Sequence, residues 1–336
     1  MRLCERISHD RLWPVLEQAA IQTVIAGGIA AMGFYRDAWR RQSSLDKAQK
    51  NPSTMADLEA TVSILQTCHA LLSPIAGQLR CGLSYLGEEA THDEYLRTRL
   101  TDEVLTQKHT PQRFFESPEN VLRVIFDGID GTSNFDRRMP LFCTAAAILI
   151  DDQVRLSALY DPIHHQVYSA ILPGPYDQAE SDATAFAWEV ATGNRRDLVD
   201  EAEKKGTTTL EQEAVALHLS RSSQQKLDEL LGERSEGRGS ILKRLAVTCR
   251  GVYALNSGLL AMTRVATGDL GAYINNSTCL WDVAAGEVLV RATGGSVSRF
   301  DGTPIRYRSA ERIAVVAAKR GLHSTILDLL AGTGPG

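Results

Sequence analysis

The N-terminal part of the chain carries apolar residues at helical spacing. Over residues 11–42 this spacing predicts one long helix, whose basic last turn suits the negative end of a helix dipole. The cations of that turn are Arg36, Arg40 and Arg41. The apolar stretch 19–35 falls short of a membrane span and contains Gln22 and Thr23, so we expect a buried core helix there.

A second helix and a first strand follow after a short break. The helix is predicted over residues 55–75, where one apolar face is formed by Leu58, Val62, Leu65 and Leu72. Residues 82–90 predict a short strand that ends in a loop carrying Glu88 and Glu89. Residues 92–120 are polar, and we expect them to form an excursion on the surface.

The middle of the chain predicts a run of strands. Residues 121–127 are an apolar run that predicts one strand. Residues 141–172 predict successive strands, with an Asp-Asp turn at 151–152 and an Asp-Pro turn at 161–162.

A change in composition follows these strands. Residues 173–212 are rich in Pro, Gly, Asp and Glu and predict a hinge or insertion around a small hairpin near Phe186. From residue 214 onward the chain alternates between predicted strands at 214–221, 242–248, 271–275 and 311–319 and predicted helices at 222–232, 255–267, 281–292 and 322–330. This alternation predicts an α/β layered fold. We expect an N-terminal half over 1–172, an insertion over 173–213 and a C-terminal half over 214–336.

Composition and charge narrow the class of protein. The chain has 336 residues, 43% hydrophobic and 23% charged, with a net charge of −5, which argues against disorder and against a nucleic-acid polymer as partner. Six cysteines lie singly, so we expect reduced thiols rather than disulfides. The charged N-terminus shows no signal peptide, and we expect a cytoplasmic protein with no membrane partner.

Candidate chemistry centres on the sequence FDGIDGTSNF at residues 126–135. Asp127 and Asp130 offer hard oxygen ligands of the kind that suit Mg²⁺, Mn²⁺ or Ca²⁺. Carboxylates so close would repel each other unless a cation lies between them. The following turn, 131–134, offers backbone amides and hydroxyls that suit an anionic oxygen. Taken alone, the Asp-x-x-Asp pair is more typical of an Asx-type turn than of a metal site.

Further acidic residues change that balance. Asp57, the Glu88–Glu89 pair and Asp282 each have an ordinary interpretation as a solvated charge or a helix cap. Together and in this order they resemble the inositol monophosphatase family of Mg²⁺-dependent, Li⁺-sensitive phosphatases. The resemblance is carried by Thr54–Asp57, Gly87–Glu89, Asp127–Phe135 followed by Pro140, and Trp281–Gly286 followed by Gly294–Gly295.

The resemblance implies a fold and a metal site. The fold is an α-β-α-β-α sandwich of alternating helix and sheet layers. One Mg²⁺ is held by Glu88, Asp127 and the carbonyl of Ile129. A second is held by Asp127, Asp130 and Asp282, so that Asp127 bridges two ions about 4 Å apart. Two or three ions are implied, with Mn²⁺ as a substitute. The N-terminal half then supplies most ligands, and the carboxylates of Asp127 and Asp282 must lie within about 8 Å.

The resemblance also implies catalytic and substrate roles. The proposed catalytic residues are Asp57, Thr132 and Glu88, with Thr132 and Asp57 orienting and deprotonating a metal-bound water. The proposed substrate-binding residues are Gly131, Thr132, Ser133, Ser257 and Asn275. The partner is a small phosphorylated metabolite, and the family resemblance implies a homodimer.

Two positions depart from the family pattern. Gly128 replaces a proline, which loosens the metal loop and adds unfolded-state entropy of about 0.5–1 kcal/mol. Asn275 stands where inositol monophosphatases carry a glutamate, and a neutral amide tolerates a second anion that Arg137 or Arg138 could meet. A phosphomonoesterase for a small polyol or sugar phosphate is therefore the leading interpretation. The alternatives are a bisphosphatase of the same family, for fructose 1,6-bisphosphate or a 3′,5′-bisphosphate nucleotide, and a non-catalytic binding protein.

Overall fold

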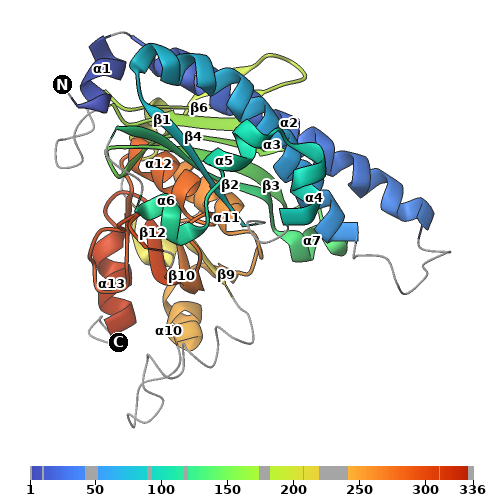
Figure 1. Cartoon of the computed structure of the whole chain (residues 1–336). Helices are drawn as coiled ribbons and strands as arrows, with labels where there is room; N and C mark the ends of the chain where they lie inside the picture. The colour runs from blue at the N-terminus through green and yellow to red at the C-terminus, as the bar shows by residue number, and fades with distance from the viewer. Residues whose placement is uncertain are drawn as a thin grey trace.

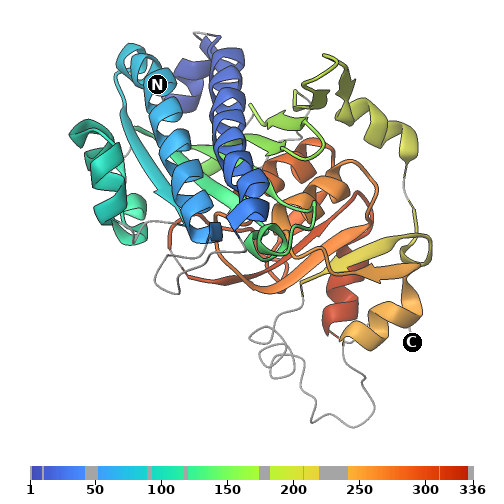
Figure 2. The same ribbon diagram turned by 90° about the vertical axis from the view of Figure 1, so that its right-hand side faces the viewer.

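Helices and sheets alternate in layers through the molecule (Figures 1 and 2). The computed structural model describes residues 2–9, 11–41, 52–88, 93–116, 120–173, 182–206, 208–218, 241–309 and 311–331. The order of layers is a helix pair, a seven-stranded sheet, a second helix pair, a five-stranded sheet and a third helix pair. The α-β-α-β-α sandwich expected from the family resemblance is confirmed.

The first sheet follows the order of the chain. Its strands are β1 (Gly82–Gly87), β2 (Val121–Asp130), β3 (Cys143–Ile150), β4 (Gln153–Asp161), β5 (Gln166–Ile171), β6 (Thr184–Glu189) and β7 (Arg195–Asp197). β1 pairs with β2 in parallel, and each later pair is antiparallel. The predicted strands and turns between 121 and 172 are confirmed. The hairpin expected near Phe186 is formed by β6 and β7 and lies at the edge of this sheet.

Three N-terminal helices belong to the outer face of the first sheet. They are α1 (Leu3–His9), α2 (Trp13–Arg41) and α3 (Pro52–Leu79). The apolar face predicted for α3 is buried in a core shared with α2 and the sheet, which includes Leu16, Val24, Leu58, Leu65, Leu72, Val124, Phe126, Ile148 and Leu156. Apolar spacing therefore predicted both long helices, whereas α1 was missed.

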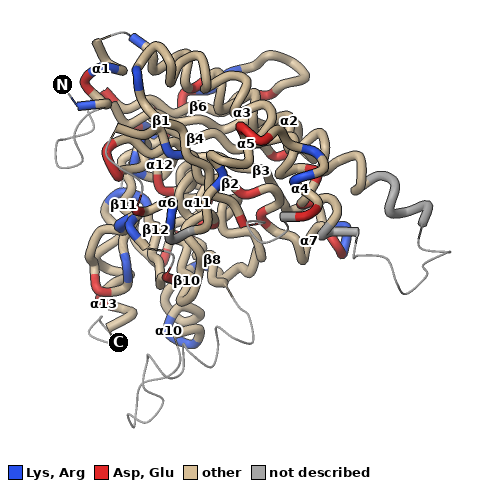
Figure 3. Tube along the Cα trace, in the orientation of Figure 1, with Lys and Arg blue, Asp and Glu red and all other residues tan. Residues whose placement is uncertain are grey.

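α2 has an uncharged middle, without a charged residue between Glu17 and Arg36 (Figure 3). Its stretch Trp13–Tyr35, with a mean hydropathy of 1.4, is long and apolar enough to cross a membrane by length and composition. Half of that stretch (50%) is buried, against α3 and strands of the first sheet. α2 therefore contributes to the core, as its apolar spacing predicted.

The second sheet has the strand order β11-β12-β10-β8-β9. Its strands are β8 (Ala214–Leu217), β9 (Gly251–Tyr253), β10 (Ala272–Thr278), β11 (Ser296–Ser298) and β12 (Ile313–Ala318). Helices α11 (Gly258–Ala266) and α12 (Ala284–Ala292) lie between the two sheets, in a core to which both contribute. Helices α10 (Ile241–Thr248) and α13 (His323–Ala331) cover the outer face.

The structure corrects two of the predicted elements. Residues 242–248, predicted as a strand, belong to helix α10, because Ile241 and Leu245 are buried on one helical face while Val247 is 78% exposed. The region 92–120 is not only a polar excursion. It contains α4 (Asp93–Arg99), α5 (Asp102–Gln107) and α6 (Pro111–Phe115), which bury Leu96, Val104 and Phe114. The helix predicted at 222–232 lies outside the described residues.

The link between the two sheets is helical. β7 leads into α8 (Leu198–Lys205), whose first turn is capped by Asp197 through hydrogen bonds from the amides of Val199 and Asp200. A 3-10 helix, Leu210–Gln212, precedes β8. Helix α7 (Thr132–Asp136) is a single turn directly after β2, and it belongs to the candidate site.

Candidate active site

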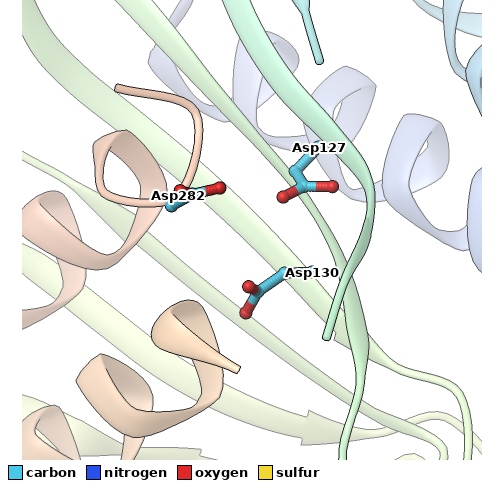
Figure 4. A group of neighbouring side chains, drawn as sticks. All are labelled: Asp127, Asp130 and Asp282. Carbon is cyan, nitrogen blue, oxygen red and sulfur yellow. The ribbon is translucent and has the colours of Figure 1, made fainter. Parts of the chain in front are cut away.

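Three carboxylates from distant parts of the chain meet at one point (Figure 4). Asp127 and Asp130 come from the end of β2, and Asp282 comes from the turn before α12. One oxygen of each lies within 4.8 Å of the others. The expectation that Asp127 and Asp282 come within about 8 Å of each other is confirmed. A chain separation of 155 residues is bridged by the packing of α12 against the first sheet.

A bulge in β2 turns both of its aspartates to the same side. Residues three apart on a regular strand point to opposite faces of the sheet. Here the pairing with β3 shifts between Asp127, opposite Ala145, and Asp130, opposite Cys143, so β2 has one extra residue. The amide of Ile129 donates to Asp127 Oδ1 at 3.0 Å and fixes the bulge.

Gly128 lets this bulge lie tightly against helix α3. A Cβ at this position would lie 3.2 Å from the carbonyl oxygen of Asp57 and 3.3 Å from the hydroxyl of Thr61. The missing side chain therefore makes room for a helix backbone, and the segment is packed. Close packing compensates for the freedom that glycine brings to the unfolded chain.

The turn after Asp130 needs glycine for a different reason. Gly131 has a φ of +96°, and a Cβ there would lie 2.7 Å from the carbonyl oxygen of Leu141. The amide of buried Asn134 donates to the carbonyls of Leu141 and Leu255, both at 2.7 Å. The turn is thus attached to the segment before α11 and to the segment before β3.

Asp130 is held at the N-terminus of α11. Its carboxylate accepts the hydroxyl of Ser257 at 2.5 Å, the amide of Leu259 at 2.8 Å and the amide of Gly258 at 3.2 Å. Ser257 is also the N-cap of α11 and accepts from the amide of Leu260. A carboxylate at this end of a helix is favoured by the unpaired amides and the dipole.

Asp282 is fixed by the segment between β10 and α12. Its Oδ2 accepts the hydroxyl of Thr278 at 2.7 Å and the amide of Cys279 at 3.1 Å. The helix predicted from Trp281 begins three residues later, at Ala284. Asp282 therefore lies in a turn and presents its other oxygen to the cluster.

Burial and mutual repulsion disfavour the charged form of these acids. Burial raises the pKa of Asp127 well above its usual range, and Glu88, Asp130 and Asp282 raise it further. Burial and Asp282 raise the pKa of Asp130 to about 6, although its donors from α11 act in the opposite direction. A divalent cation among these oxygens would remove the repulsion, so the donor set fits Mg²⁺ or Mn²⁺.

The cluster forms the floor of a cavity of about 530 Å³. Of the residues proposed from the sequence, its lining includes Glu88, Asp127, Ile129, Asp130, Gly131, Thr132, Ser133, Asn275 and Asp282. Glu88 is exposed at the end of β1 and lies outside the tight three-carboxylate group. Glu89 lies outside the described residues. The structure brings most of the proposed site together in one place.

Two of the proposed residues lie behind the lining. Asp57 is 5% exposed in α3 and contributes negative charge that raises the pKa of Asp127. Ser257 is 2% exposed and holds Asp130, as described above. The hydroxyl of Thr132 donates to the carbonyl of Ile129 at 3.0 Å, so its predicted partnership with Asp57 stays a prediction.

Asn275 makes both of its side-chain hydrogen bonds within the protein. Its Nδ2 donates to the hydroxyl of Tyr273 at 2.9 Å, and its Oδ1 accepts the amide of Ser277 at 3.0 Å. The residue lines the cavity but is only 3% exposed. Each of its polar atoms thus has one partner within the protein, and one N–H and one lone pair are left for a substrate.

Sequence reasoning missed several lining residues. They are Asn134, Met139, His218, Asn256, Gly258, Tyr273 and Thr278, while Arg137 was noted only as a possible anion contact. Thr278 donates its hydroxyl to the Asp282 carboxylate, a contact that no local sequence pattern signals. His218 follows β8 and Asn256 precedes α11, and no local pattern distinguishes either from an ordinary loop residue.

Comparisons with known proteins agree with this geometry. A model of the inositol monophosphatase family matches residues 14–332. An inositol-1-monophosphatase of Bacillus subtilis is 26% identical over 205 residues, which cover 61% of this chain and 66% of that protein. The Nus factor SuhB of Pasteurella multocida is 22% identical over 187 residues, 56% of this chain and 60% of that protein. This chain thus spans less than two thirds of both relatives.

Solved structures share the fold. The inositol monophosphatase from Anabaena (Nostoc) sp. PCC 7120 superposes with a TM-score of 0.60 at 17% sequence identity, covering 95% of this chain and 96% of that one. At this identity the match establishes the layered architecture alone.

Proposed function

The chain belongs to the inositol monophosphatase family, and from this premise we propose that it is a Mg²⁺-dependent phosphomonoesterase. Its substrate would be a small phosphorylated polyol or sugar. The observation that carries the proposal is the convergence of Asp127, Asp130 and Asp282 within 4.8 Å on the floor of a cavity. Three carboxylates so close together, two of them buried and one partly buried, are unfavourable without a cation, so an apo-only role does not account for them.

The residues that would hold the ions divide into two sets. Glu88, Asp127 and the carbonyl of Ile129 would hold one ion, and Asp127, Asp130 and Asp282 would hold another. Bound Mg²⁺ supplies charge neutralisation for the phosphate and lowers the pKa of a coordinated water. We propose two or three ions, with Mn²⁺ as a substitute and Li⁺ as an inhibitor.

The chain's own groups would bind and orient the phosphate. The amides of Gly131 and Thr132, at the tight turn after β2, are proposed to donate to phosphate oxygens. The hydroxyl of Thr132 would turn from the carbonyl of Ile129 toward the attacking water, with Asp57 behind it accepting a proton. The first sheet and α7 would thus position the phosphate, and the segments around α11 and β10 would face the leaving group.

Phosphate release with and without Mg²⁺ tests this proposal. The panel contains inositol 1-phosphate, fructose 1,6-bisphosphate and a 3′,5′-bisphosphate nucleotide, and Asp282→Asn serves as the site variant. We expect release from at least one member that EDTA abolishes and Mg²⁺ restores, and a loss of at least 100-fold in the variant. Release that persists in EDTA, or an Asp282→Asn variant as active as the wild type, would overturn the metal mechanism.

Relatives named Nus factor SuhB support a second candidate, a binding or regulatory protein that has the fold but no turnover. Lys and Arg are interspersed with Asp and Glu along the described chain (Figure 3), a distribution that does not favour binding to a nucleic-acid polymer. The expectation that no such polymer is a partner stays a prediction. Absence of release from the whole panel, together with Mg²⁺ binding measured by calorimetry, would favour this second function. We also propose that the protein is a homodimer and that it lies in the cytoplasm. Light scattering tests the dimer.

A further inference from the structure

The cavity extends beyond its acidic floor to a wall of different chemistry. Its four carboxylates, those of Glu88, Asp127, Asp130 and Asp282, all belong to the proposed metal set. Among the described lining residues outside that set, the ionisable side chains of basic character are Arg137 and His218. Once the carboxylates are neutralised by cations, the charge facing a substrate's leaving group is positive.

The neutral amide on this wall is already partly engaged within the protein. This amide is that of Asn275, whose oxygen accepts from Ser277 and whose nitrogen donates to Tyr273. The hydroxyl of Tyr273 lies in the same buried pair. Asn275 and Tyr273 therefore hold each other, and neither carries a positive charge that would distinguish a phosphate or carboxylate from a hydroxyl group.

Arg137 lines the cavity and is held by its own helix turn. It is the C-cap of α7, and its Nη1 donates to the carbonyl of Ser133 at 3.0 Å. A guanidinium has five N–H donors in a planar fork, so one bond fixes it and leaves the others for an anion. The neighbouring Arg138 has a different environment, since its Nη1 reaches the carbonyl of Tyr35 and it does not line the cavity.

His218 lines the same cavity from the second sheet. Its amide donates to the carbonyl of Ile274, which fixes the backbone at the end of β8. Within the part of the chain that the structure describes, its ring makes no hydrogen bond. A ring N–H is a donor in either protonation state, so the residue is suited to an anionic oxygen. Arg312, bonded to the carbonyl of Ser277, adds positive charge near His218.

We infer that Arg137 and His218 form a second anion subsite, and that the preferred substrate is a polyol or sugar phosphate whose leaving group carries another phosphate or a carboxylate. The inference rests on the proposed function and specifies its substrate class. A volume of about 530 Å³ is sufficient for such a molecule. Charge-assisted bonds from a guanidinium to phosphate or carboxylate are stronger than neutral ones, which makes the second anion a basis for selectivity.

Two matched substrate pairs test the inference. Fructose 1,6-bisphosphate is compared with fructose 1-phosphate, and 6-phosphogluconate is compared with glucitol 6-phosphate. The variants are Arg137→Gln and His218→Gln, and Arg138→Gln is the control that removes the same charge one residue away. We expect wild-type kcat/KM to favour one or both anionic members by roughly tenfold. Each site variant should lower that tenfold preference by about three- to tenfold, mainly through KM, and the control should retain it.

The outcomes separate this inference from the proposed function. A preference for the bisphosphate alone or the acid alone identifies the second anion as phosphate or carboxylate. Equal kcat/KM within both pairs, or an equal loss on both members in Arg137→Gln, overturns the subsite but leaves the phosphatase intact. If no substrate releases phosphate, the proposed function fails. The pairs are then compared by titration calorimetry with Mg²⁺ present, and equal affinities would overturn the subsite as well.

Discussion

Replacing Ser257 by alanine tests how the fold holds the carboxylate of Asp130. The hydroxyl of Ser257 has two partners: it donates to Asp130 Oδ2 at 2.5 Å and caps α11 by accepting from Leu260. Removal of a hydrogen bond to a charged group costs about 1.5–3 kcal/mol, and loss of an N-cap costs about 0.5–2 kcal/mol. Because one hydroxyl makes both bonds, we expect a combined loss of about 2–3 kcal/mol in unfolding free energy.

The loss should depend on pH, and its sign follows from the titration of Asp130. The pKa of Asp130 is raised to about 6, and the bond from Ser257 is the strongest influence that lowers it. Without that bond the pKa rises further, so the charged form, present above pH 6, loses most. We expect the full loss at pH 7.5 and only the cap contribution, about 1 kcal/mol, at pH 4.5, where Asp130 is protonated.

Urea unfolding in EDTA at the two pH values measures both quantities. Thr101→Ala is the matched control, since Thr101 caps α5 through the amide of Val104 with no carboxylate attached. Its loss should be about 1 kcal/mol at either pH. If Ser257→Ala loses no more than Thr101→Ala at pH 7.5, the bond to Asp130 does not contribute as argued and the carboxylate is held by backbone amides alone.

Three other predictions concern the same site. In EDTA the wild-type protein should lose stability as the pH rises from about 4 to above 6, because the folded state binds the extra proton on Asp130; the loss from Asp130 alone is up to roughly 3 kcal/mol. Mg²⁺ should reverse this loss in thermal scans. A stability that does not change with pH would count against the raised pKa of Asp130. Gly131→Ala should cost more than 2 kcal/mol and weaken Mg²⁺ binding in calorimetry, since a Cβ would lie 2.7 Å from a carbonyl at positive φ; a loss below 1 kcal/mol would contradict this. Gly128→Ala meets contacts of only 3.2–3.4 Å and should cost about 1 kcal/mol or less, and a larger loss in urea unfolding would show that α3 cannot yield.

Regular periodicity made the layers of the fold predictable. The long helices α2 and α3 carry apolar residues at helical spacing because each buries one face. The strands β2 to β5 are short, largely apolar runs between turns because both of their faces are buried. The prediction of a strand at 242–248 failed because Leu242 and Val247 are exposed apolar residues that break the helical pattern. The short strands β9 and β11 have three residues each, too few to show any period.

The candidate site, too, could be predicted from the sequence only in part. The resemblance to the inositol monophosphatase family predicted that Asp127, Asp130 and Asp282 meet around one point. It did not predict the bulge that brings the first two to one side, which is a property of pairing with β3. Nor did it show that Ser257 holds a carboxylate, or that the amide of Asn275 is already bonded to Tyr273. Those roles depend on contacts between segments far apart in the chain.

Such contacts make the site and the fold a single cooperative unit. Asp130, on β2 of the first sheet, accepts from the first amides of α11, which lies between the sheets. Asn134, in the turn after β2, donates to the carbonyl of Leu255 just before that helix. The segment before residue 172 cannot hold Asp130 alone, because the donors to this carboxylate, the Ser257 hydroxyl and the amides of Gly258 and Leu259, all lie after residue 214. A cation bound there would stabilise the junction and hence the packing of both sheets on α11, so metal binding and global stability are linked.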